Sequence, residues 1–385
     1  MIRGAAITFR EAGYIAPRFS SNGTRLVVRE SHLVPPPPNL FDRSCLQMDQ
    51  AGTIDGNTQH ASAFPHLGVV VIGRNEGLRL VACFNSLPKV PVVYVDSGST
   101  DASVTAARQR HIDVVELDLS VPFTAARARN AGFAQLLRTH PDLIYVQFVD
   151  GDCQLLEEWT KSALAFLESS SDVAAVCGRL RERYPDRSVY NWLCDKEWDR
   201  PVGKVRSCAG NVMMRVLALT NVGGYREDVI AAEEDELCVR LRAADWHIWR
   251  LPDAMAYHDA AMLHFRQWWR RAFRAGYAFA QGAHLHGSTP DRHFVWESRR
   301  AWIWGLLLPL LCTSAGFVLH PLGWNAFLIY PLQLLRLIAN GSGSARDRVR
   351  LATFQLLARF PEGLGQLAFL RDRILRQRPQ LIEHK

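Results

Sequence analysis

Two carboxylates that could hold a metal ion follow an apolar segment near the middle of the chain. Asp150 and Asp152 flank a glycine directly after residues 144–149, which predict a buried strand. Carboxylates this close repel each other, and a divalent cation relieves the repulsion because Mg²⁺ and Mn²⁺ prefer hard oxygen ligands. The cation could in turn clamp a diphosphate. We therefore expect Asp150 and Asp152 to bind Mg²⁺ or Mn²⁺.

Three further polar clusters stand at comparable places in the sequence. Asn75 and Glu76 follow the apolar residues 67–72, and Asp96 begins the polar stretch 96–101. A third cluster, at residues 128–132, lies early in an expected helix and contains Arg129 and Asn130. Each cluster taken alone could be a helix cap or a turn.

The surrounding elements would bring these clusters to one edge of a sheet. Strand-like segments at 67–72, 91–95, 112–117 and 143–149 alternate with helical patterns at 76–87, 102–109, 124–138 and 155–168. This alternation predicts an α/β fold with a doubly wound, mostly parallel, Rossmann-like sheet. Ligands bind beyond the carboxyl ends of the strands in such sheets, where the polar clusters lie.

In this order the motifs resemble those of the family 2 glycosyltransferases, which have the GT-A type of nucleotide-sugar-binding fold. The resemblance covers residues 67–258. Beyond the clusters already named, it rests on Ala209-Gly210-Asn211, Val222-Gly223-Gly224-Tyr225, the acidic run Glu233–Glu236 with Leu237, Pro252-Asp253-Ala254 and Tyr257-His258. Each motif is weak alone, but their combination and order are specific.

The resemblance implies roles for individual residues. Asn75, Glu76 and Asp96 would hold the base and ribose of the nucleotide, while Asp150, Asp152 and His258 would form the metal site. The wider set that would bind the nucleotide sugar is Asn75, Glu76, Asp96, Ser99, Arg129, Asn130, Asp150, Gly210 and Asn211. His258 could instead be a hydrogen-bonded histidine at a strand end.

An inverting transferase needs a carboxylate that accepts the proton of the acceptor hydroxyl. The family places a Glu-Asp pair at the start of a helix, and here that pair falls on Glu233 and Glu234. Glu234 takes the position of the usual Asp, and the neighbouring Asp235 is its rival as the base. An acidic first helical turn that is stabilised by the helix dipole is the structural alternative.

A tryptophan-rich segment follows the region of resemblance. Gln267, Trp268, Trp269 and Arg270 partly match a Gln-x-x-Arg-Trp motif of processive family members, but Arg271 stands where the final tryptophan belongs. These residues would contact an acceptor sugar or anchor the chain at a membrane interface. We therefore expect transfer of a single sugar and no processive polymer synthesis.

The rest of the chain predicts membrane association on the cytoplasmic side. Residues 301–319 and 321–335 contain no charged residue, and arginines flank both segments. The expected domains are a poorly ordered extension (1–65), the catalytic domain (66–262), amphipathic interfacial helices (263–300), a transmembrane or re-entrant helical hairpin (301–340), and an amphipathic basic helix with a tail (341–385). A buried hairpin packed on the soluble domain is the alternative.

Charge and cysteine content narrow the possible partners. The net charge of +7 favours anionic partners, and the arginines beside tryptophans and apolar segments point to lipid headgroups and not to nucleic acid. Eight cysteines without a CxxC pair argue against a zinc module and against a dense disulfide framework.

Together these features predict a metal-dependent, inverting glycosyltransferase at the inner (plasma) membrane. It would use a nucleotide-diphosphate sugar and a glycan or lipid-linked acceptor, in the synthesis of cell-surface polysaccharide or glycolipid. The alternatives are a catalytically silent, membrane-anchored carbohydrate-binding scaffold and, less favoured, a nucleotidyltransferase. The segment 73–77 is too short and acidic for the basic phosphate loop of the latter class.

Overall fold

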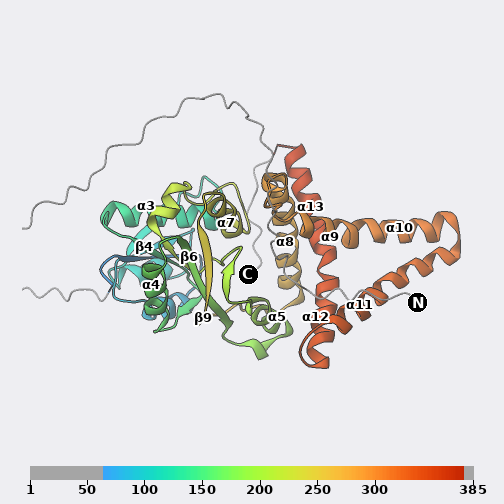
Figure 1. Ribbon diagram of the computed structural model, residues 1–385, viewed down its shortest axis with the longest axis horizontal. Helices are drawn as coiled ribbons and strands as arrows, with labels where there is room; N and C mark the ends of the chain where they lie inside the picture. Colours follow the sequence, from blue (N-terminus) through green and yellow to red (C-terminus); the bar gives the residue numbers. More distant parts are fainter. Residues whose placement is uncertain (1–63, 377–385) are drawn as a thin grey trace, which may run out of the picture. The chain divides into compact units, whose positions relative to one another are not determined.

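The computed structural model describes residues 64–376 (Figure 1). All of the described residues belong to one compact unit. All but the last two residues of the expected N-terminal extension lie outside the described part.

Nine strands within residues 64–376 form one mixed sheet. Its path runs β3-β2-β1-β4-β8-β6-β9-β5, and β7 pairs with β9. Neighbours from β3 to β4 are parallel, β8 is antiparallel to both β4 and β6, and β9 is parallel to β6. The strands are β1 (Leu67–Gly73), β2 (Val92–Asp96), β3 (Asp113–Glu116), β4 (Tyr145–Asp150), β5 (Cys153–Leu155), β6 (Val173–Glu182), β7 (Gly203–Val205), β8 (Val212–Arg215) and β9 (His247–His258).

Helices cover both faces of this sheet because its central strands are apolar on both sides. In β1, Val69 and Val71 join one hydrophobic cluster while Val70 joins the other, as the alternation of a strand requires. Helices α1 (Leu78–Asn85) and α4 (Trp159–Ser169) pack into the first cluster. Helices α3 (Ala125–Thr139), α6 (Val216–Asn221) and α7 (Glu233–Ala243) pack into the second. The short helix α2 (Ser103–Arg108) connects β2 to β3.

The expected strands and helices of residues 67–168 are present, with small differences at their ends. The main difference concerns the helix expected over 155–168, which begins only at Trp159. Cys153–Leu155 instead forms β5, which pairs with the end of β9. This pairing brings the segment after Asp152 next to His258.

Six α-helices follow the sheet in the described part of the chain: α8 (Phe265–His286), α9 (Val295–Trp302), α10 (Leu308–Ser314), α11 (Ile329–Asn340), α12 (Ala345–Leu357) and α13 (Arg359–Ile374). A 3-10 helix, Pro321–Leu328, precedes α11. Helices α8 and α13 approach closely because glycines leave room between them. A Cβ on Gly276 would lie 2.0 Å from the carbonyl oxygen of Glu362, and one on Gly365 would lie 2.1 Å from that of Phe273. An earlier helix, α5 (Val189–Trp198), joins α8 and α12 in a third hydrophobic cluster.

Residues 295–340 contain two long, apolar helical segments. Val295–Val318 and Pro321–Asn340 are long and apolar enough to cross a membrane. In an apolar stretch of 18 residues within each segment, 22% of the first stretch and 0% of the second are buried. The first segment begins at Val295, before the expected boundary at 301, and includes π-helical turns at Ile303–Leu307 and Ala315–Leu319. Aromatic contact between Phe317 and Trp324 closes the connection between the two segments. In Figure 1 they run from α9 through α10 and return through α11.

Candidate active site

The loops after β1 and β2 are locked to each other by hydrogen bonds. The Asn75 Oδ1 accepts from the backbone N–H of Thr100 at 2.7 Å, and the Asn75 N–H donates to the Ser99 Oγ at 2.9 Å. The Gly77 N–H donates to the Asp101 Oδ2 at 3.0 Å. Asn75 and Ser99, both expected to bind the nucleotide, therefore lie in one cradle of two loops.

Asp96 is buried beneath this cradle and organises its turn. Its Oδ2 accepts from the backbone N–H groups of Gly98 and Ser99 at 2.9 and 2.8 Å, and its Oδ1 accepts from the Tyr94 hydroxyl at 2.8 Å. Glu76 forms a 2.7 Å ion pair with Arg79. These contacts hold the carboxylates in place at the carboxyl ends of β1 and β2.

Arg129 connects the two acidic parts of the site. It extends from the first turns of α3, and its Nη2 donates to the Asp150 Oδ1 at 2.9 Å while its Nη1 donates to the Glu233 Oε1 at 2.6 Å. Its guanidinium also lies 5.6 Å from the centre of the Tyr225 ring. One buried cation thus holds the end of β4 and the start of α7 together.

The neighbouring Asn130 points away from Arg129 toward the Gly223-Gly224 turn. Its amide nitrogen donates to the Tyr225 carbonyl at 2.8 Å, and its Oδ1 accepts from the Tyr225 N–H at 2.9 Å. Asn130 therefore fixes the loop that carries Tyr225 beneath the Arg129 guanidinium.

Gly210 and Asn211 complete the surroundings of Asp150. A Cβ on Gly210 would lie 2.3 Å from the Arg129 Nη2 and 3.0 Å from the Asp150 Oδ2, so only glycine leaves room for this ion pair. The Asn211 Oδ1 accepts from the Asp150 N–H at 3.0 Å. The side chain of Asp150 is still 31% exposed, which leaves it accessible to a ligand.

The acidic run 233–236 forms the first turn of α7, as expected. Ala232 precedes it with φ 57° and ψ 37°, which is a left-handed conformation. This conformation is energetically unfavourable for any residue other than glycine. This conformation turns the chain sharply just before the carboxylates of Glu233 and Glu234.

The carboxylates in this turn have different environments. Burial alone would raise the pKa of Glu233, but the positive charges of Arg129 and Arg274 lower it below its usual range. Burial, together with the negative charges of Glu233 and Asp235, raises the pKa of Glu234 well above that of an ordinary glutamate. Among residues 64–376, no side chain hydrogen-bonds or pairs with the Glu234 carboxylate, which is half-buried.

The other two acidic residues of the turn have partners. Burial raises the pKa of Asp235, and a hydrogen bond with the Ser207 side chain opposes that rise. Glu236 is buried, pairs with Arg240 at 2.7 Å, and lies 3.0 Å from the Nε2 of His286 on α8. Glu234 is therefore the carboxylate of this turn that is most available for proton transfer.

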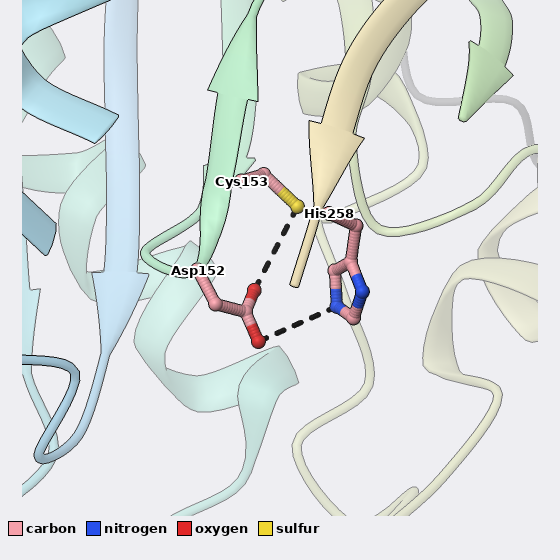
Figure 2. A group of neighbouring side chains, drawn as sticks. All are labelled: Asp152, Cys153 and His258. Carbon is pink, nitrogen blue, oxygen red and sulfur yellow. Dashed lines mark hydrogen bonds and ion pairs between the residues drawn. The ribbon is translucent and has the colours of Figure 1, made fainter. Parts of the chain in front are cut away.

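The candidate metal site lies at the junction of β5 and β9. The His258 Nε2 lies 3.3 Å from the Asp152 Oδ2, and the Cys153 thiol lies 3.7 Å from the Asp152 Oδ1 (Figure 2). One donor atom from each of the three residues falls within 4.8 Å of the others. Oxygen and nitrogen donors this close are suited to a divalent cation. Asp150 contacts Arg129 and Asn211 and is not part of this group.

The tryptophan-rich segment has structural contacts at the start of α8. The Gln267 Oε1 accepts from the backbone N–H groups of Leu263 and His264, which caps the helix. Trp268 is buried against Phe354 and Tyr190, at ring-centre distances of 5.1 and 6.5 Å. Trp269 is half-buried, and Arg270 is exposed.

Sequence reasoning missed Cys153 and Glu182. Cys153 pairs with His258 in the β5–β9 register, which no local pattern reveals because the residues are far apart in sequence. Glu182 had a usable signal, since it is an acidic residue at the end of an apolar strand. Its carboxylate is buried and lies 3.9 Å from the His258 Nδ1.

One solved structure agrees with this fold. The mannosyltransferase PcManGT from Pyrobaculum calidifontis, in complex with GDP-Man and Mn²⁺, has a TM-score of 0.52 and 18% identity, with 78% of this chain and 87% of that chain covered. TarS 1-349 of S. aureus has a TM-score of 0.42 and 17% identity, with 77% and 91% covered. No curated protein sequence matches the chain. Residues 68–212 match the sequence model of glycosyl transferase family 2, so this part of the chain is a glycosyl transferase family 2 domain.

Proposed function

We propose that the chain transfers one sugar from a nucleotide-diphosphate sugar to a hydroxyl of a glycan or lipid-linked acceptor, with inversion at the anomeric carbon. The observation that carries this proposal is the double ion pair of Arg129 with Asp150 and Glu233. Through this pair, Asp150 and the acidic start of α7 both lie beside the Arg129 guanidinium. A donor and an acceptor held there would meet in a single site.

Asn75, Ser99 and the Asp96 turn would hold the nucleoside, because their loops form a preorganised cradle of polar groups. Asp152 and His258 would hold a divalent cation, and their oxygen and nitrogen donors fit such an ion. A bound cation would stabilise the negative charge of the departing diphosphate. PcManGT was solved with GDP-Man and Mn²⁺, so this donor and this ion are the first to test.

Glu234 would act as the base. As the acceptor oxygen attacks the anomeric carbon and the bond to the diphosphate breaks, Glu234 would accept the hydroxyl proton. Its raised pKa makes the ionised carboxylate a stronger proton acceptor than an ordinary glutamate. Glu233, whose pKa is lowered by Arg129 and Arg274, would remain ionised and position Arg129.

The two apolar segments within 295–340 would attach the enzyme to a membrane, with the catalytic domain on the cytoplasmic side. Their outer surface supports this, since large hydrophobic side chains such as Leu310, Phe317 and Leu332 are exposed. A soluble protein would not expose so much apolar surface without a partner. An acceptor carried by a lipid would then be close to the site.

Calorimetric titration of the detergent-solubilised protein with GDP-, UDP- and dTDP-sugars, with and without Mn²⁺, tests the proposal. We expect Mn²⁺-dependent binding of one nucleotide class and its loss in Asp152→Ala. Turnover with an acceptor should then be lost in Glu234→Gln and retained in Asp235→Asn. Absence of any nucleotide-sugar binding by the folded protein would contradict the proposal and favour a silent scaffold.

A further inference from the structure

Three adjacent strands place potential metal-binding side chains in one row. Cys153 on β5 pairs with His258 on β9, and His258 pairs with Glu182 on β6. Residues that pair directly across strands project from the same face of a sheet. Cys153, His258 and Glu182 therefore share a face, and Asp152 reaches the same place from the turn before β5 (Figure 2).

From this row we infer that Cys153 is a metal ligand beside Asp152 and His258. With one thiolate among its ligands, the site binds a borderline-soft cation such as Zn²⁺ or Co²⁺. The inference rests on the metal-dependent function proposed above and adds a sulfur donor to it. A set of one sulfur, one nitrogen and one oxygen donor suits Zn²⁺ or Co²⁺ better than Mg²⁺, which prefers oxygen ligands and retained waters.

The surroundings of the thiol favour this role. Cys153 is fully buried, and its Sγ has two polar neighbours, the Asn211 amide nitrogen at 3.3 Å and the Asp152 Oδ1 at 3.7 Å. Binding of a cation would displace the thiol proton to water, leaving the sulfur between the cation and the Asn211 amide. Three protein ligands would leave a position for a diphosphate oxygen.

Glu182 would orient His258 without touching the cation. Its carboxylate faces the His258 Nδ1 at 3.9 Å, while the Nε2 faces Asp152. Three donors hold this carboxylate in place: the Asn191 side chain and the backbone N–H groups of Tyr184 and Ala260. A carboxylate behind a metal-binding histidine fixes its tautomer and ring orientation.

Titration of the nucleotide-free protein with Co²⁺, followed by absorbance, tests the inference. The unchanged protein should show a thiolate-to-cobalt charge-transfer band in the near ultraviolet, and a large excess of Mg²⁺ should not remove it. Cys153→Ser should lose this band and keep the visible d–d bands. Cys83→Ser is the matched control because Cys83 is equally buried and lies near Asp150, and it should keep the charge-transfer band. In Glu182→Gln the band should persist while the affinity for Co²⁺ falls by about 10- to 100-fold.

Other outcomes would overturn the inference. Visible bands without the charge-transfer band in the unchanged protein would mean that Asp152 and His258 bind the ion without sulfur, and the proposed function would stand. A charge-transfer band that survives in Cys153→Ser would place the thiolate elsewhere. Absence of any cobalt spectrum would overturn the inference, while the titration with nucleotide sugars would decide the proposed function separately.

A second experiment applies if Cys153→Ser does not fold. X-ray absorption of the Zn²⁺-loaded unchanged protein should then show one sulfur ligand at about 2.3 Å from the zinc, and this sulfur should be lost in Asp152→Asn. A zinc coordination shell of only nitrogen and oxygen would contradict the inference.

Discussion

The Nη1 of Arg129 lies 2.6 Å from the Oε1 of Glu233, and these side chains are only 3% and 5% exposed. The pair joins α3 to α7 across the carboxyl edge of the sheet. Because Arg129 also pairs with Asp150, its removal would leave two carboxylates without their shared cation, whereas removal of Glu233 would leave Arg129 still paired.

We predict that Arg129→Met destabilises the protein by roughly 3 kcal/mol, since breaking a buried ion pair leaves uncompensated charge. Urea unfolding measures this change. Arg108→Met, which removes an exposed ion pair with Glu116, is the control and should change stability by less than about 1 kcal/mol. Addition of Glu233→Gln to Arg129→Met should restore part of the loss, and simple additivity of the two changes would show that the pair is not coupled.

The raised pKa of Glu234 predicts a pH profile for sugar transfer. A base must be ionised, so the acidic limb of kcat/KM should lie at a higher pH than an ordinary glutamate would give. Replacement of Glu234 by Gln should lower kcat by about 10²- to 10⁴-fold. A steady-state profile over pH measures both, and an unchanged acidic limb in Glu234→Asp would assign the limb to another group.

The same carboxyl predicts a dependence of stability on pH. The pKa of Glu234 is higher in the folded than in the unfolded state, so the folded state binds the proton more tightly. This contribution to stability is complete below the unfolded pKa and is lost as the pH rises through the folded pKa. Glu234→Gln should therefore raise Tm at neutral and alkaline pH relative to the unchanged protein. An equal shift at all pH values would contradict this account.

Gly210→Ala should disrupt the contact between Arg129 and Asp150. The added methyl group would lie 2.3 Å from the Arg129 Nη2, which forces the guanidinium to move. We expect a loss of about 1–3 kcal/mol in stability, as in other overpacked sites, together with loss of turnover. Thermal unfolding and an activity assay measure these effects. Gly341→Ala serves as the control because its Cβ would lie 3.2 Å from the flexible Arg348 side chain and 3.3 Å from the Leu337 carbonyl oxygen, which are far looser contacts than those at Gly210.

Arginine at Leu310 and Leu332 should weaken membrane binding. These side chains are 65% and 64% exposed, and a charged residue at the centre of a membrane helix costs about 2.5–3.5 kcal/mol on insertion scales. Flotation with phospholipid vesicles should show the double variant Leu310→Arg, Leu332→Arg partly in the soluble fraction. Leu217→Arg, at an exposed leucine of α6, should float like the unchanged protein. Equal flotation of all three would place the membrane contact elsewhere.

Much of the sheet could be predicted because apolar segments and polar strand ends are local signals. The strands around Val69, Tyr94 and Phe148 alternate with helices of clear periodicity, and the parallel-sheet rule placed Asp96 and Asp150 at one edge. The antiparallel insertion of β8 between β4 and β6 was not predicted, since strand order depends on long-range pairing.

The candidate site was predicted less completely for the same reason. The resemblance to the family implied that Arg129 and Asn130 would lie near the nucleotide, but not that Arg129 contacts Asp150 and Asn130 contacts Tyr225. The segment at 267–270 drew attention because tryptophans are suited both to sugars and to lipid. Only the packing of α5, α8 and α12 shows that Trp268 fills a hydrophobic cluster.

The contact between Glu236 and His286 links the folding of the catalytic domain to α8. The family match ends at residue 212 and the sheet at residue 258, so a cut near 262 would look natural from the sequence. Such a cut would remove one of two partners of a buried carboxylate and uncover the apolar side chains that pack on Trp268. We therefore expect the smallest independently folding piece to extend at least through α8, and truncation before α8 to yield an aggregating fragment.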